Sequence, residues 1–340
     1  MTATTRWACV YGACLVIAMA LELVLGGPET LPPGRILSAL NDNHAADSVG
    51  AIDRIVLTEI RIPRAILGAL VGGSLAVAGV LMQGLFRNPL ASPGILGATA
   101  GGAFGAVFAV AAGLNELSIY ATPIAAFVGT LFALFVVTLM AASRFHLSIP
   151  HLLLCGIAVN TLFSAGTSLI LTFSADYYYV SRQIIDWLTG SLVTNPAGWK
   201  LAPVVLPSFV VLSVVALLLG RDLNLLLTGE DSARSLGVPM RSIRVAVLVL
   251  ASLLTGLAVA IAGMVGFIGL VAPHVVRLLQ GPDHRGLLVS APLFGAAFLL
   301  VCDVVAQNAI PPDEIQLGII TSLIGGPFFL YLLLRDRRAA

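Results

Sequence analysis

The chain has 340 residues, of which 58% are hydrophobic and only 10% are charged, and its formal net charge is +1. A soluble protein of this length needs many more charged residues to cover its surface, so these values exclude an ordinary soluble enzyme. No block of basic residues is present, so nucleic acid is not an expected partner. Repeated apolar runs of about 20 residues instead indicate a polytopic membrane protein of the all-α class.

Ten apolar segments follow one another along the chain. The first, residues 7–25, is long enough to cross a bilayer, so we interpret it as a retained helix rather than a cleaved signal peptide. Glu22, near its end, is expected to lie at the membrane interface rather than to be buried. The other nine segments are expected at residues 65–86, 95–112, 119–142, 152–173, 201–219, 245–265, 266–277, 286–306 and 315–334.

The connections and the shorter segments carry further signals. Residues 26–58 are rich in Gly, Pro, Asp and Asn and are predicted to form a polar loop on the membrane face. Segment 266–277 is too short to cross a bilayer and contains Pro273, which predicts a half-span or re-entrant helix covered by protein. Gly68 and Gly72 have the four-residue spacing that predicts close packing against another helix.

The stretch from Thr228 to Arg244 concentrates charge in a chain that has little of it. Thr228 is expected to cap a helix, and Asp231, three residues later, completes an approximate capping box. Gly237 and Pro239 then supply a stop signal. The pattern predicts a helix of about eight residues, or roughly 12 Å, which is too short to cross a bilayer and lies outside it.

The basic residues predict the orientation of the chain. Ten crossings place both termini on one side of the membrane, together with the stretch 228–244, and 12 of the 18 basic residues fall on that side. The positive-inside rule therefore predicts that both termini and this stretch are cytoplasmic. The six basic residues on the other side are Arg35, Arg54, Arg61, Arg64, Arg182 and Lys200.

No catalytic or metal-binding pattern is present in the sequence. A Walker A loop requires Gly-x-x-x-x-Gly-Lys-Ser/Thr, and the only lysine, Lys200, follows Trp199. The histidines and cysteines have no metal-ligand spacing. We therefore expect no catalytic residue, no metal site and no cofactor on this chain, and energy for any transport must come from a partner or from an ion gradient.

Two other function classes compete on the same residues. An ion-coupled secondary transporter usually has ionisable residues at mid-membrane on broken helices, whereas here only Arg277 and Asp303 stand out within the spans. An intramembrane enzyme requires clustered His, Asp or Glu within the spans, and the sequence has no such cluster. Both alternatives are disfavoured.

Six motifs, taken in order, resemble the permease subunits of bacterial type II ABC importers for iron–siderophore, haem and cobalamin. Together the motifs cover the chain from about residue 55 to its end. They are Arg61–Arg64, Gln83–Gly94, Gly229–Gly237, Gly266–His274, Asp283–Arg285 and Leu317–Phe329.

The resemblance implies a homodimer of ten-helix subunits in the bacterial inner (plasma) membrane, with the translocation path along the dimer axis. Each chain would be one permease domain, 1–340, in contact with membrane lipid. Two cytoplasmic ABC ATPase subunits would bind ATP and Mg²⁺, and a substrate-binding protein would deliver cargo from outside. The expected cargo is an iron–siderophore complex, with haem or cobalamin as the alternatives.

The resemblance also implies roles for particular residues. A coupling helix at about 228–240 would contact the ATPase through Thr228, Gly229, Glu230, Asp231, Ala233, Arg234, Leu236 and Gly237. Arg61 and Arg64 match outward arginines that dock the binding protein, whereas Gln307 stands where some relatives carry a third arginine. Ser148, Ile149 and Pro150 match a cytoplasmic gate, although Ile149 and Pro150 replace the small hydroxyl residues of a cobalamin transporter.

Overall fold

The computed structural model describes residues 3–27, 29–40, 48–142, 149–174, 177–192 and 198–336, and helices form almost all of them. The element η2 is a π-helical turn and η3 is a 3-10 helix. In chain order the elements are α1 (Ala3–Leu25), α2 (Pro33–Leu40), α3 (Ser48–Ile55), η2 (Val56–Arg61), α4 (Ile62–Phe86), η3 (Pro93–Leu96), α5 (Ala98–Ala111), α6 (Leu114–Leu117), α7 (Ala121–Ala142), α8 (Ile149–Phe173), α9 (Tyr178–Thr189), α10 (Gly198–Leu218), α11 (Gly220–Leu226), α12 (Glu230–Ser235), α13 (Met240–Ala262), α14 (Ile268–Gln280), α15 (His284–Asn308) and α16 (Leu317–Asp336).

Within the described ranges, seven helices are long and apolar enough to cross a bilayer. They are α1, α4 with the turns that precede it, α7, α8, α10, α13 and α15. Three shorter apolar helices, α5, α14 and α16, complete the set. Seven and three give the ten apolar segments expected from the sequence, and the all-α membrane architecture is confirmed.

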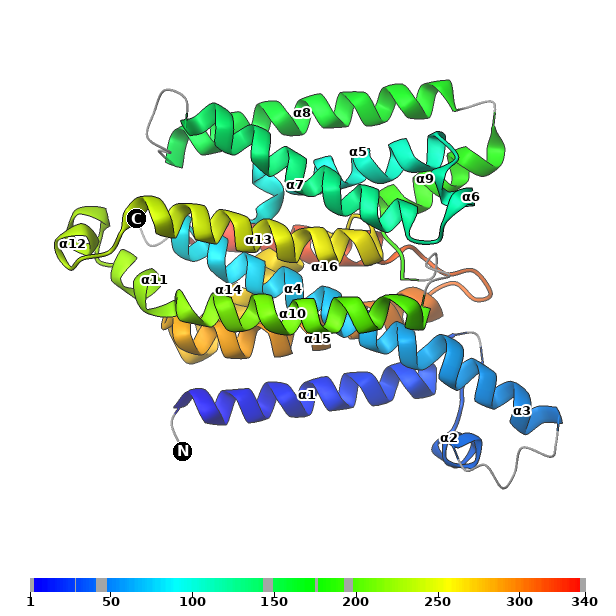
Figure 1. Cartoon of the computed structure of the whole chain (residues 1–340). Coiled ribbons are helices and arrows are strands. Elements are labelled where there is room, and N and C mark those ends of the chain that lie inside the picture. The colour runs from blue at the N-terminus through cyan, green and yellow to red at the C-terminus, as the bar shows by residue number, and fades with distance from the viewer. Residues whose placement is uncertain are drawn as a thin grey trace.

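Helix α4 lies at the centre of the bundle, among α10, α13, α14 and α15 (Figure 1). Almost every residue from Ala65 to Phe86 is buried. Its glycines permit this crowding: a Cβ atom at Gly72 would collide with the Gly295 carbonyl of α15, and one at Gly79 with the Gly269 carbonyl of α14. The close packing predicted for the Gly68–Gly72 face is therefore confirmed.

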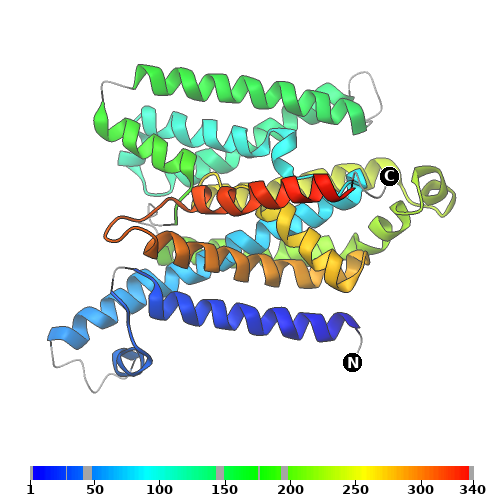
Figure 2. The same ribbon diagram turned by 180° about the vertical axis from the view of Figure 1, so that it is seen from behind.

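Two groups of helices flank this centre. Helices α5, α7, α8 and α9 pack together on one side, and α1 lies against α15 on the other, so that α8 and α1 form opposite edges in both views (Figure 1, Figure 2). Glycine again allows close approach, because Cβ atoms at Gly101 and Gly105 of α5 would collide with the backbone of α7.

The two ends of the bundle are unlike. Helices α11 and α12 project from one end, where α1 begins and α16 ends, and α2 and α3 lie at the opposite end (Figure 1, Figure 2). The start of the first helix and the end of the last helix therefore lie at the same end of the bundle as α12, which an even number of crossings requires.

The described part of segment 26–58, which was predicted to be a polar loop, is instead largely helical. Helices α2 and α3 lie within it, and η2 runs without a break into α4, so the second span begins well before Ala65. The polar residues join these elements: Arg35 Nε of α2 donates to Asp53 Oδ2 of α3 over 2.7 Å. The loop prediction was wrong because composition does not reveal such pairing.

The half-span prediction is confirmed. Helix α14 has 13 residues, or about 20 Å, against the roughly 30 Å of a bilayer core. Phe267 precedes it with a left-handed φ of 65°, and residues 268–273 are all buried. Protein therefore covers the first half of this short helix, where irregular backbone precedes it at membrane depth.

Candidate functional site

The charged stretch 228–244 folds into a helix shorter than predicted. Helix α12 has six residues, and Gly229 precedes it with a φ of 109° and no side-chain cap. The Thr228 hydroxyl donates to the Leu225 carbonyl over 2.8 Å because it belongs to the end of α11. The predicted capping box is therefore wrong, and so is a helix spanning 228–240, since α13 already begins at Met240.

The predicted stop signal is confirmed. Gly237 has a φ of 88°, a conformation that L-amino acids rarely adopt. The Gly237 amide donates to the Arg234 carbonyl and the Val238 amide to the Ala233 carbonyl, both over 3.0 Å. These two hydrogen bonds form a Schellman motif, which satisfies the last carbonyls of α12 and turns the chain back towards α13.

Two polar contacts join this region to the spans. Glu230 of α12 accepts from Arg244 Nη2 of α13 over 2.7 Å, and the Arg244 side chain is nearly buried. Asn224 of α11 donates to Asp283, and Asn224 Oδ1 accepts from the His284 amide of α15 over 2.7 Å. These contacts tie α11 and α12 to the beginnings of two membrane helices, α13 and α15.

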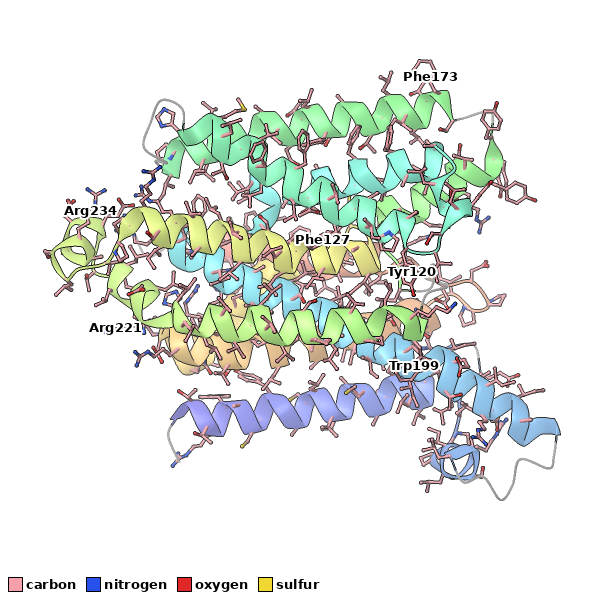
Figure 3. The ribbon with its side chains drawn as sticks, viewed as in Figure 1. Tyr120, Phe127, Phe173, Trp199, Arg221 and Arg234 are labelled. Atoms are coloured by element: carbon pink, nitrogen blue, oxygen red, sulfur yellow. The ribbon has the colours of Figure 1, made fainter. Side chains whose placement is uncertain are left out.

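The rest of this element faces outward. Ala233 is buried, whereas Asp231, Arg234 and Leu236 are exposed, Leu236 at 60%. Figure 3 shows Arg234 at the extreme end of the molecule, with Arg221 on the neighbouring α11. We call residues 220–237 the coupling element. It exposes an acid, a base and an apolar side chain at one end of the bundle.

A second polar group lies at the opposite end and was not predicted. We call it the carboxylate–arginine cluster: Glu22, Arg64, Asp303, Gln307 and Glu314. Arg64 is bidentate on Asp303, with Nε and Nη2 donating over 2.7 and 2.9 Å, and its Nη1 donates to Glu314 over 3.1 Å. Gln307 Nε2 donates to Glu22 over 2.6 Å and to Asp303 over 3.1 Å. The cluster ties α1, α4 and α15 to the loop before α16.

Glu22 is therefore not the interfacial carboxylate that we expected. Its residue is 0% exposed, and its Oε1 lies 3.8 Å from Arg64 Nε. The sequence held a usable signal, because an acid inside an apolar span marks a paired or functional group by default. Two such acids, Glu22 and Asp303, stand in the first and ninth spans, and Arg64 provides their counter-charge.

The two predicted docking arginines both point into the chain. Arg61 is only 3% exposed, and its guanidinium donates to the carbonyls of Leu23 and Val24 at the end of α1 and to that of Glu29 beyond it. These contacts satisfy carbonyl groups that a helix end leaves without partners. Docking by Arg61 and Arg64 remains a prediction, and it requires both side chains to leave these partners.

The predicted gate is only partly described. Ser148 lies outside the described residues, and Ile149 and Pro150 form the first turn of α8, half-buried and exposed respectively. This turn lies at the same end of the bundle as α12 (Figure 1). The gating role remains a prediction.

A cavity of about 650 Å³ opens where several helices are interrupted. Its wall combines η3, the end of α9, the break at 264–267 and the start of α16. All of its lining residues are uncharged, and the polar ones carry only hydroxyl groups: Ser92, Thr99, Thr189, Thr255 and Ser322. Such a surface can contact a bulky molecule without a specific charge requirement.

Comparison with known proteins agrees with this architecture. The sequence matches the FecCD transport family over residues 14–335. The cobalamin import system permease protein BtuC of Halobacterium salinarum is 42% identical over 323 residues, covering 95% of this chain and 79% of the relative. The hemin transport system permease protein HmuU of Yersinia pestis is 42% identical over 281 residues, covering 82% of this chain and 83% of the relative.

A solved structure supports the same assignment. A putative metal-chelate type ABC transporter in an inward-facing conformation superimposes with a TM-score of 0.84 at 32% sequence identity, covering 97% of this chain and 99% of that one. The resemblance drawn from the six motifs is confirmed. The chain therefore belongs to the FecCD transport family and is the membrane-spanning permease subunit of an ABC importer, not its ATP-hydrolysing subunit.

Proposed function

We propose that this chain works as a homodimer that carries a metal chelate inward, driven by two ABC ATPase subunits that bind ATP and Mg²⁺ and supplied by a substrate-binding protein. The coupling element is the observation that carries the proposal. It is closed by a Schellman motif, tied to α13 and α15, and exposed on its charged side. A chain without a Walker A loop needs such a rigid handle to receive work from a partner.

The proposed orientation places the coupling element in the cytoplasm of the cell, with the permease in the inner (plasma) membrane. Twelve of the 18 basic residues belong to that side, which the positive-inside rule makes cytoplasmic. Helix α1 begins on that side and helix α16 ends on it (Figure 2), so both termini would also be cytoplasmic. The carboxylate–arginine cluster would then lie at the outer face.

Among the candidate cargos, the named relatives favour cobalamin or haem. Relatives at 42% identity are a cobalamin permease and a hemin permease. The iron–siderophore complex expected from the sequence is the second candidate, because the related solved transporter is of the metal-chelate type. The uncharged lining of the cavity does not discriminate among these cargos by charge.

Reconstitution tests the function and the cargo together. The permease would be placed in liposomes with the ATPase and the binding protein encoded beside it, and the binding protein would be loaded in turn with cobalamin, haem or an iron–siderophore complex. We expect ATP-dependent uptake and stimulation of ATP hydrolysis with one of these cargos. Cobalamin and haem are the first candidates. Uptake driven by a proton or sodium gradient without the ATPase would overturn the proposal and favour a secondary transporter.

A further inference from the structure

Arg277, like Arg61, donates only to neutral groups, but unlike Arg61 it lines a cavity. Its Nη1 donates to Gln83 Oε1 over 2.7 Å, and Gln83 Nε2 donates to the Leu270 carbonyl over 3.2 Å. Both acceptors are neutral, and no described carboxylate forms an ion pair with this half-buried guanidinium. Arg64 and Arg244, by contrast, each have an acidic partner. A positive charge withdrawn from water without a counter-charge is costly, so Arg277 calls for an anion.

The space beside Arg277 has the features of an anion site. A cavity of about 510 Å³ lies between the end of α4, α11 and the turn that joins α14 to α15. Arg87, the residue that ends α4, contributes a second guanidinium to the wall. The remaining lining residues are Gln83, Phe86, Asn88, Pro89, Leu227, Pro282 and His284.

His284 contributes a buried ring to the same wall. The residue is 1% exposed, and its Nε2 has no hydrogen-bond partner. Its Nδ1 lies 3.0 Å from Asn224 Oδ1. The Asn224 amide nitrogen donates to Asp283, so the oxygen is an acceptor and Nδ1 carries the ring proton. Nε2 is therefore an acceptor enclosed against Gly84 of α4, where it does not contact the space of the cavity.

We propose that this cavity binds the phosphate group of an anionic phospholipid headgroup. Two guanidinium groups from different elements suit a tetrahedral oxyanion, because each can donate two N–H groups to it. Apolar surface for acyl chains adjoins the cations: Leu227 lines the cavity, and Leu278 and Leu279 are 56% and 51% exposed. Basic pockets between membrane helices on the cytoplasmic side are suited to such headgroups.

A lipid bound at this position would connect parts of the permease that are separate in the sequence. Arg87 ends α4, Arg277 lies on the half-span α14, and Leu227 ends the α11 part of the coupling element. A phosphate held by both arginines joins the central helix to the half-span beside the place where a partner acts. Lipid occupancy then stiffens the region through which the coupling element moves the spans.

Native mass spectrometry of the purified permease tests this site without any transport measurement. Phosphatidylglycerol would be titrated against phosphatidylcholine with the same acyl chains, and inorganic phosphate would be added in a separate series. We expect phosphatidylglycerol to bind more tightly, and Arg277→Gln and Arg87→Gln to weaken it on the order of tenfold each. Arg221→Gln, an exposed arginine at the same end of the bundle, is the matched control and should change nothing (Figure 3).

Each outcome bears on the proposal. Equal binding of phosphatidylglycerol by the wild-type protein and Arg277→Gln would overturn it, as would equal affinity for the two lipids. Arg87 is exposed, so Arg87→Gln keeps the test decisive if Arg277→Gln fails to fold. Inorganic phosphate that binds in place of lipid with the same dependence on both arginines would support the phosphate site and overturn lipid as its source. If the permease binds neither phospholipid nor inorganic phosphate, and Arg277 instead crosslinks to a carboxylate of the ATPase, the proposal is overturned in favour of a protein partner.

Discussion

The carboxylate–arginine cluster and the coupling element use the same residue types at opposite ends of the bundle, yet in opposite ways. At one end, Arg64 is enclosed by Asp303 and Glu314, and Glu22 is fully buried. At the other end, Arg234 projects from the molecule (Figure 3). The buried charges of the first group pair with one another, whereas the charged side chains on the outer face of the second are left accessible.

Reversal of the buried arginine should have the largest effect. Arg64→Glu would place a third acid against Glu22 and Asp303 and remove their counter-charge, at a cost above about 3–5 kcal/mol. We expect little folded permease in size-exclusion chromatography. The docking prediction expects instead a folded permease that has lost only its association with the binding protein in liposomes. That second result would contradict the structural role assigned to Arg64.

Neutralisation of one buried acid should have the next largest effect. Asp303→Asn keeps the shape of the side chain but leaves Arg64 without its bidentate partner, and should cost about 3 kcal/mol of stability. Glu314→Gln is the matched control, because that side chain is 30% exposed and its pair should contribute less than about 1 kcal/mol. Thermal unfolding in detergent measures both. Equal shifts in Tm would mean that burial does not determine how much each ion pair contributes to stability.

A change at the stop of α12 should affect function more than stability. Gly237 has a φ of 88°, and no atom lies within 4 Å of the position that a Cβ would take, so Gly237→Val adds only backbone strain, about 1–2 kcal/mol. Gly113 has a φ of 69° and equally open surroundings, and Gly113→Val is therefore the control. We expect similar Tm values but fewer cargo molecules per ATP for Gly237→Val alone. An identical transport ratio in both variants would argue against a coupling role.

The smallest effect is expected at Asp283, which ties α11 to α15. Partial burial alone would raise the pKa of Asp283, but hydrogen bonds from Asn224, Gly286 and Arg285 outweigh it and the pKa is lowered. The stabilisation is therefore present above the unfolded value of about 3.9 and is lost as the pH falls through the folded pKa. Asp283→Ala, which removes the N-cap of α15, should lose about 1 kcal/mol near pH 7. The Tm difference should shrink on acidification, and a constant difference would contradict this assignment.

Much of the fold follows from local patterns in the sequence. Apolar runs located ten membrane segments, and the shortness of 266–277 together with Pro273 predicted the half-span α14. Gly237 predicted the end of α12 because the left-handed turn there favours glycine. These features depend on residues close together in the chain, and short-range sequence analysis therefore finds them.

The polar contacts escaped prediction because they are long-range. Gln307 and Glu22 are 285 positions apart, and Arg64 and Asp303 are 239 apart. Periodicity carries no information about such pairs. The start of α12 was also misplaced, because α11 extends far enough to occupy the Thr228 hydroxyl that would otherwise cap the helix.

The central claim is that the coupling element transmits work from the ATPase to the spans. The most direct test is the ratio of cargo imported to ATP hydrolysed in proteoliposomes for Asp231→Arg combined with Arg234→Glu, which preserves net charge at two exposed positions. Arg182→Asp combined with Asp186→Arg on α9 is the control. We expect both variants to fold, and we expect the ratio of cargo imported to ATP hydrolysed to fall in the first variant only. A wild-type ratio in that variant would contradict the claim.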